Sequence, residues 1–444
     1  MKRSTFSIRP LVLFTALAAS GMAHVQAQSL VQLYESARAY DAAYQSAKSQ
    51  YAANLAKADQ AMAGIYPTAN LSAGVTRSLF ENSNPAVDRG FTSQNATVSA
   101  NQPLYRPGNW ATYEQGKKQI ALAQAALNTA EQDLVVRVSQ AYFDVLASQD
   151  SLTFVKAQKA AVAEQLASAK RNFEVGTSTI TDTREAQARF DLVLAQEIAA
   201  ENDLRVKKIA LDQLVGKADS QPWPVATPLQ MPAMQPQNVD EWVTQSEQQH
   251  PTIQSARLAL EVAQLETTKA EAGHKPTLDA TLSHTRTRSL GGSTSSGLSG
   301  QSQNTAIGLA FNLPLFAGFA TQNRIRETLQ LEDKARNDLE AARRSIAQAT
   351  RTAFFGVVSG QGQVKALEAA ESSSQSALEA NKLGYQVGVR INIDVLNSQS
   401  QLFQTKRDLA KARYDVLLGG LKLRQANGSL QAQDLNTVNA LLVK

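Results

Sequence analysis

The two halves of this 444-residue chain carry the same sequence motifs at an almost constant separation. Ala141-Tyr-Phe-Asp-Val-Leu146 in the first half matches Ala353-Phe-Phe-Gly-Val-Val358 in the second, 212 residues further on. The segment from Asn172 to Asp182 matches the segment from Gly384 to Asp394 with the same separation. Elsewhere the separation drifts by a few residues, as insertions in loops would produce. The chain must therefore fold as two copies of one unit.

A seven-residue repeat of apolar residues runs through each half, largely without Pro or Gly. In the first half it extends from about Asn109 to Asn172, through Leu127, Leu134, Ala141, Ser148, Val155, Val162 and Ala169. A second series, offset by three, contains Val138, Val145, Leu152, Leu166 and Phe173, and the second half repeats the pattern through Leu339, Ile346 and Ala353. Such a repeat is typical of a left-handed coiled coil. At 1.5 Å per residue it predicts a helix of roughly 95 Å.

Segments in which apolar and polar residues alternate precede each long helix. The apolar members include Leu71, Ala73 and Val75 in the first half and Ile307, Leu309 and Phe311 in the second. A period of two predicts β-strands with one face in contact with water. We expect two β-hairpins, with exposed, flexible loops over Glu81–Thr92 and Ser289–Asn304.

Each half therefore reads helix, strand, strand, very long helix, tight turn and return helix. The helices before the strands are expected to break near Asp41 in the first half and before Pro251 in the second. The predicted divisions are 1–27 (signal peptide), 28–66 (helices), 67–105 (first hairpin), 106–215 (long helix, tip and return helix), 216–240 (irregular segment), 241–275 (helices), 276–316 (second hairpin), 317–427 (second helix pair) and 428–444 (C-terminal tail).

The first 27 residues have the pattern of a secretory signal peptide. A basic start with Lys2, Arg3 and Arg9 precedes an apolar run over residues 11–19 and a small-residue cleavage site at Ala27. These three basic residues account for 3 of the formal net charge of +5. The mature chain is thus near neutral, and we expect no nucleic-acid partner. The absence of cysteine excludes disulfides, thiol catalysis and cysteine-ligated metal sites.

The two hairpins supply four strands, which is too few for a closed barrel. Outside the signal peptide, no apolar run is long enough for a membrane-spanning helix, so a spanning segment would have to be β. The smallest closed barrels need about eight strands, and an open edge in lipid leaves costly unpaired backbone groups. We therefore expect several copies to share one barrel. The alternative is an ordinary soluble sheet packed against helices.

The duplicated halves, the strand ends Gln102-Pro-Leu-Tyr105 and Leu313-Pro-Leu-Phe316, and the turn motifs over 175–182 and 385–396 resemble the TolC family of outer-membrane exit ducts. The resemblance covers essentially the whole mature chain. It implies a mainly α fold with a small β part: a homotrimer with a shared twelve-strand outer-membrane β-barrel continuous with a periplasmic coiled-coil α-barrel. It also implies two partners, a periplasmic adaptor (membrane fusion protein) and an inner-membrane ABC or proton-driven transporter.

The turns at the far ends of the long helices contain the candidate functional residues. Each turn has a glycine, Gly176 or Gly388, suited to a left-handed helix C-cap. Asp182 or Asp394 then lies near the start of the return helix. Helix capping is one interpretation of these acids, because Asp182 and Glu185 have the spacing of a capping box.

The resemblance adds a second interpretation, a periplasmic gate. In the TolC type, Asp and Thr of one tip bond Tyr and Arg of the other and hold the tunnel shut. The corresponding residues here are Thr181, Asp182, Tyr385 and Arg390. An adaptor would compete for the tips, with the glycine turns as its docking points.

The resemblance also assigns a lumen ring to the second tip. Asp394 corresponds to an inner acidic ring, which would attract cations when several copies surround the pore. Asn397 stands where the family has a second acid. The negative field of this second ring is therefore expected to be weaker, and strong cation selectivity does not follow.

No pattern in the sequence indicates an enzyme. His250, His274 and His284 lack the spacing of zinc ligands on a helix, and no phosphate-binding loop, dinucleotide fingerprint or nucleophile elbow is present. We expect no cofactor and no catalytic residue. Two classes of function remain, a passive exit duct for efflux or type I secretion and a soluble periplasmic coiled-coil scaffold or adaptor.

Overall fold

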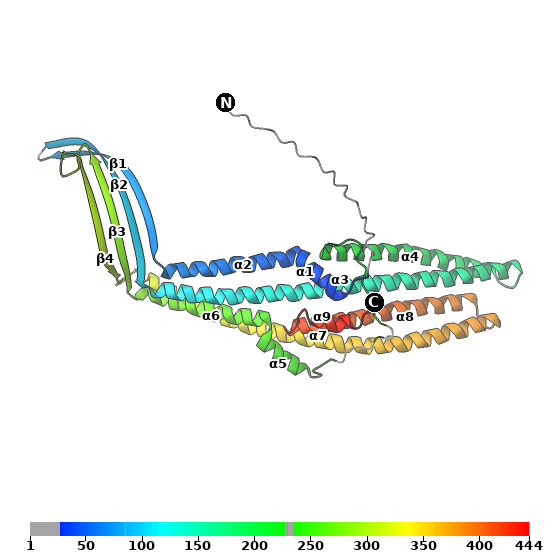
Figure 1. Ribbon diagram of the computed structural model, residues 1–444. Helices are drawn as coiled ribbons and strands as arrows, with labels where there is room; N and C mark the ends of the chain where they lie inside the picture. Colours follow the sequence, from blue (N-terminus) through cyan, green and yellow to red (C-terminus); the bar gives the residue numbers. More distant parts are fainter. Residues whose placement is uncertain (1–26, 85, 227–228, 230–233, 444) are drawn as a thin grey trace, which may run out of the picture.

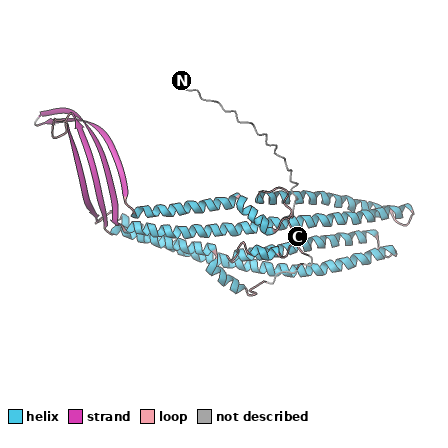
Figure 2. Cartoon of the chain, in the orientation of Figure 1, coloured by secondary structure: helices cyan, strands magenta, loops and turns pink. Residues whose placement is uncertain are grey.

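The computed structural model describes residues 27–443 except residue 85 and residues 227–228 and 230–233. The predicted signal peptide lies outside the described residues apart from its last position, Ala27. The described chain forms a long bundle of helices with one β-sheet at its end (Figure 1; Figure 2). The predicted mainly α fold with a small β part is confirmed.

The elements follow the same order in both halves. The first half contains α1 (Leu30–Tyr40), α2 (Ala42–Met62), the 3-10 helix η1 (Ala63–Ile65), β1 (Thr68–Ser83), β2 (Ala86–Tyr105), α3 (Pro107–Glu174) and α4 (Ile180–Val215). The second half contains α5 (Val239–Gln249), α6 (Pro251–Glu271), η2 (Ala272–His274), β3 (Thr277–Leu290), β4 (Gly300–Asn312), α7 (Ala320–Gln386) and α8 (Asn392–Ala426), followed by the short α9 (Asp434–Asn439). The predicted duplicated unit is confirmed.

A break separates the two shorter helices of each half, as predicted. Asp41 ends α1 by donating its backbone N–H to the carbonyl of Ala37 at 2.7 Å. The same residue starts α2, because its carboxylate accepts a hydrogen bond from the N–H of Tyr44 at 2.8 Å. Arg137 on α3 donates two further hydrogen bonds to this carboxylate, at 2.8 and 2.9 Å. In the second half His250 caps α6 at the corresponding place.

Long antiparallel helix pairs form the rest of the bundle. α3 packs beside α4, and α7 packs beside α8 (Figure 1). α3 has 68 residues, which corresponds to about 100 Å. Its predicted seven-residue series is buried at Leu134, Val138, Val145, Val155, Val162 and Ala169, which confirms the coiled-coil interpretation. In the part of the chain that the structure describes, no helix is both long and apolar enough to cross a membrane.

The four strands form one antiparallel sheet in the order β1-β2-β3-β4. β2 pairs with β1 on one side and with β3 on the other, and β3 also pairs with β4. β1 and β4 therefore form the two edges of the sheet, each with a strand partner on one side only among the described residues. All 13 residues of β4 are exposed.

The strands extend further from the helices than predicted. Most of the segment Glu81–Thr92, expected as a loop, belongs to β1 and β2, where Glu81 pairs with Asp88. After β3 the loop covers only residues 291–299, because Gly300 already pairs with Ser289. The prediction was wrong because backbone pairing does not require apolar side chains in alternation, and the apolar alternation stops before the strands do.

Irregular segments lie across the helices about halfway along the bundle (Figure 1). In the described part of the connection between the halves, Pro222 forms a bridge with Gln28, and Val225 forms one with Leu442 near the C-terminus. α9 contacts α1 in the same region. Leu33 of α1 and Leu435 of α9 have no exposed surface, so these segments complete a core at the middle of the molecule.

Candidate functional site

The two helix tips have the same backbone. α3 ends at Glu174 and α4 begins at Ile180; the equivalent turn joins α7 to α8. Gly176 and Gly388 both have φ of 80°, in the left-handed region that favours glycine. The N–H of Thr177 then bonds the carbonyl of Asn172 at 2.8 Å, which closes the end of α3.

A capping box fixes the first tip, but its residues differ from those predicted. Thr179 is the N-cap of α4, and Asp182, the third residue of the helix, completes the box. The Asp182 carboxylate accepts hydrogen bonds from the Thr179 N–H at 3.0 Å, the Thr179 hydroxyl at 2.7 Å and the Ser178 hydroxyl at 2.8 Å. The predicted box of Asp182 and Glu185 was wrong, since the helix starts one turn earlier.

These hydrogen bonds set the charge state of Asp182. Burial raises the pKa of the carboxyl, but hydrogen bonds from Thr179 and Ser178 to the ionised form outweigh burial and lower the pKa below its ordinary value. Asp182 is therefore a carboxylate at neutral pH and a fixed part of its own tip.

The second tip lacks this box. Its N-cap is Ile391, whose side chain makes no capping hydrogen bond. Asp394 lies in the first turn of α8 and forms an ion pair with Arg390, with Nη1 and Oδ2 3.7 Å apart. The two repeats thus share a backbone turn and differ in the polar contacts that hold it.

Within one chain, no hydrogen bond or ion pair joins the predicted gate residues to one another across the described tips. Thr181 is exposed, Asp182 serves the cap of α4, and Arg390 faces Asp394. The hydroxyl of Tyr385 accepts a hydrogen bond from the Asn172 side chain at 3.3 Å, which connects α7 to α3. The gate stays a prediction, and it requires contacts between copies or a different position of the tips.

The contacts that Asn392 and Asn397 make between the helix pairs were not predicted. Asn392 is fully buried; its amide donates to the carbonyl of Asp182 at 3.3 Å, and its oxygen accepts from Gln165. Arg189 on α4 donates to the side-chain oxygen of Asn397 on α8 at 2.7 Å. Asn392 corresponds to the apolar Ile180 in the first repeat, and this difference between repeats is a sequence signal that could have identified it.

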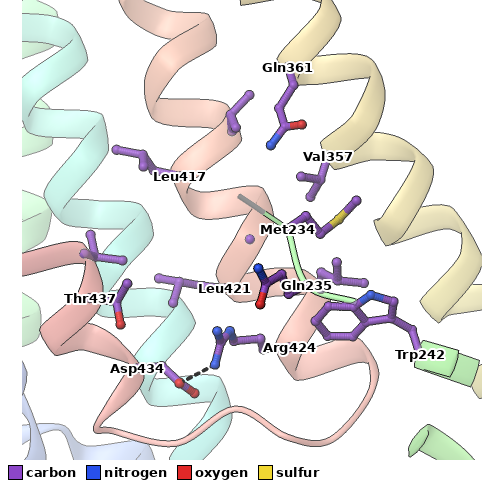
Figure 3. A pocket seen from close by; sticks show the side chains of 14 residues that line it. Met234, Gln235, Trp242, Val357, Gln361, Leu417, Leu421, Arg424, Asp434 and Thr437 are labelled. Atoms are coloured by element: carbon purple, nitrogen blue, oxygen red, sulfur yellow. Dashed lines mark hydrogen bonds and ion pairs between the residues drawn. The ribbon is translucent and has the colours of Figure 1, made fainter. Parts of the chain in front are cut away.

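A cavity of about 100 Å³ lies between α5, α7, α8 and α9, far from the tips (Figure 3). Its walls are mainly apolar and include Trp242, Val357 and Leu421. Arg424 and Asp434 face it and form an ion pair at 2.5 Å. Apart from this ion pair, the side chains that line the cavity in the described part of the chain are mostly apolar, as in packed helix interfaces.

Comparison with known proteins agrees with the architecture. The family model described as outer membrane efflux protein matches residues 33–217 and 242–429, one match in each half of the chain. The outer membrane protein TolC of Vibrio cholerae is 33% identical over 433 residues, which cover 97% of both chains. The alkaline protease secretion protein AprF of Pseudomonas aeruginosa is 30% identical over 360 residues, covering 80% of this chain and 74% of AprF.

A solved structure shows the same fold. The outer membrane protein VceC of Vibrio cholerae superposes with a TM-score of 0.77 at 20% identity, covering 90% of this chain and 96% of VceC. The matching family model is that of a channel rather than of an enzyme. The chain therefore belongs to the outer membrane efflux protein family, and it is an outer-membrane exit duct with a periplasmic extension.

Proposed function

We propose that three copies of the chain form a passive duct in a tripartite efflux or type I secretion system. An inner-membrane ABC or proton-driven transporter supplies the substrate and the energy, and a periplasmic adaptor connects the transporter to the helix tips. The observation that carries this proposal is the sheet with two free edges.

The edges and one face of the sheet need partners that a single chain does not provide. The exposed fractions of Leu71, Val75, Ile307 and Leu309 are 75%, 69%, 84% and 71%. Lipid is the environment that suits this face, and in lipid the backbone groups of β1 and β4 must pair. Pairing β4 of one copy with β1 of the next satisfies them, and three copies give a closed barrel of twelve strands.

The return helix α4 supports assembly in the periplasm. Its large apolar residues Leu192, Ile198, Val206 and Ile209 have exposed fractions of 49%, 63%, 52% and 58%. In a ring of three chains these residues would contact the next copy and lose their contact with water. A soluble scaffold of a single chain would leave both this surface and the sheet face uncovered.

The tips are the proposed gate. Thr181 and Asp182 of one tip and Tyr385 and Arg390 of another hold the resting duct closed, and Asp394 faces the lumen beside Asn397. Gly176 and Gly388 form the turns at which the adaptor docks. Arg390 supports this role, because its pair with Asp394 is long and exposed and can be exchanged for another carboxylate at little cost.

The test is the assembly and conductance of the full mature chain. Purified in detergent, the protein is expected to have the mass of three copies and to form channels in planar bilayers. Arg390→Ser and Tyr385→Phe together are expected to raise the single-channel conductance. A protein that stays monomeric in buffer without detergent and forms no channels would contradict the proposed function.

A further inference from the structure

The two faces of the sheet differ in chemistry. Residues opposite each other on neighbouring antiparallel strands point to the same face, and Ala100, Leu282 and Ile307 are opposite one another on β2, β3 and β4. We call this the lipid face; its large apolar residues include Leu71, Val75, Leu79, Val98, Leu278, Leu282, Leu290, Ile307, Leu309 and Phe311. The opposite face carries mainly Ser, Thr and Asn, as expected of a water-filled lumen.

Basic residues appear on the lipid face with distance from the helices, and Leu79 and Leu290 lie on the same face beyond them. On β3, Leu278, Ala280 and Leu282 are followed on the same face by His284, Arg286 and Arg288. Arg77 of β1 lies on this face as well. It follows Val75 by two residues, and every second residue of a strand points to the same face. Arg77, Arg286 and Arg288 are named here the distal arginine cluster.

The length of the strands places this cluster at the outer boundary of the membrane. Arg286 and Arg288 follow Leu278 by eight and ten residues, which is about 26 and 33 Å along a strand. Strands tilted by about 40° convert this to heights of about 20 and 25 Å, and the apolar band of such barrels is about 25 Å tall. Arg288 therefore lies at the outer edge of the apolar band, and Arg286 lies about 5 Å inside it, close enough for its long side chain to extend toward the lipid headgroups.

The cluster is free to bind an external group. All three arginines are exposed, and within the described chain none of them takes part in an ion pair or a side-chain hydrogen bond. Glu81 and Asp88 also lie on this face, opposite each other and closer to the hairpin turn. A hollow of about 530 Å³ lies beside Arg286 and Arg288, with walls from all four strands: Ala73, Gly74, Val75, Gln94, Asn95, Ala96 and Gln301.

We propose that the distal arginine cluster binds the phosphate groups of a phosphorylated lipid of the outer leaflet. Guanidinium groups bind phosphate through paired, charge-assisted hydrogen bonds, and a basic cluster directly beyond an apolar band fits a molecule with acyl chains below an anionic headgroup. The inference rests on the proposed placement of the sheet across the membrane. It adds a specific lipid site to that placement.

The test measures the binding of lipid A to the full mature protein in mild nonionic detergent. The probes are bisphosphorylated lipid A, the same lipid without its phosphates, and inorganic phosphate as competitor. We expect the triple variant Arg77→Gln, Arg286→Gln, Arg288→Gln to bind bisphosphorylated lipid A about tenfold more weakly, a change of about 1.4 kcal/mol. Arg89→Gln is the matched control, because Arg89 pairs opposite Phe80 on the other face of the same sheet.

Two comparisons keep the proposal open to refutation even if the triple variant fails to fold. Wild-type protein is expected to bind the dephosphorylated lipid about tenfold more weakly, and inorganic phosphate at 10 mM is not expected to displace lipid A. Equal binding of both lipids, equal binding by the triple variant, or displacement by free phosphate would overturn the lipid site. Conductance and mass are measured on the same samples, so a conducting trimer without lipid selectivity refutes this site alone.

Discussion

At the scale of single residues, the two repeats differ at a position where they touch each other. Asn392 is fully buried, whereas its counterpart Ile180 is 50% exposed. Its amide and oxygen connect α8 to Asp182 and Gln165. A buried polar group with its partners present contributes little net free energy, but its loss leaves those partners without hydrogen bonds. Asn392 therefore specifies how the two helix pairs meet at the tip.

Replacement of Asn392 tests this role. Asn392→Ala leaves the Gln165 amide and the Asp182 carbonyl without their partner, at a cost of about 1–3 kcal/mol. We expect faster hydrogen exchange in residues 387–400 and a higher frequency of open channels in planar bilayers. Asn397→Ala is the control, since its contact with Arg189 is exposed and its loss should change exchange much less. Equal exchange in both variants would show that burial of Asn392 has no special effect.

Acid should loosen the first tip through Asp182. The pKa of Asp182 is below its ordinary value in the folded state, so its hydrogen bonds contribute stability above the unfolded pKa. This contribution is lost as the pH falls through the folded pKa. Hydrogen exchange at residues 178–183, corrected for intrinsic rates, is expected to increase below about pH 4.

The same cap gives a second readout. Thr179→Ala should destabilise the start of α4 by about 1 kcal/mol at neutral pH, and Asp182→Asn should abolish the pH dependence of exchange at this tip. An unchanged pH dependence in Asp182→Asn would assign the acid response to another group.

At the scale of elements, periodicity predicted most of the structure. The seam residues Val155 and Val162 are buried, as predicted, and the helix break lies at Asp41. These features could be predicted because they depend on residues close in sequence. The strand ends and the Arg189–Asn397 contact were not predicted. Strand length follows from backbone pairing, and a contact between distant helices depends on how the helix pairs are positioned, which a local pattern does not encode.

The break at Asp41 is expected to be a point of high stability. Asp41→Ala removes the N-cap of α2 and both hydrogen bonds to Arg137. The cap contributes about 1 kcal/mol and the charged hydrogen bonds about 1.5–3 kcal/mol. We expect the thermal unfolding midpoint, followed by circular dichroism, to fall by several degrees. Asp333→Ala, which removes an exposed ion pair with Arg336, should leave the midpoint nearly unchanged.

At the scale of the whole molecule, one chain is an incomplete object. Its helices enclose cores of their own, but among the described residues β1 and β4 have free edges, and large apolar residues of α4 and the sheet are exposed. The sequence predicted this incompleteness from the number of strands. The number of copies follows from the proposed assembly, and the gate at the tips depends on it, because its four residues do not meet within one chain.

Disulfide cross-linking tests the sharing of one barrel most directly, because the chain contains no cysteine. Ser72→Cys on β1 is combined with a single cysteine at each position from Gln303 to Phe311 on β4. Within one chain these edges are three strand spacings apart, roughly 14 Å, beyond the Cα separation of about 7 Å that a disulfide allows. The account predicts that at least one cysteine position on β4 gives cross-linked species of two and three copies. Monomer alone at every position would contradict it.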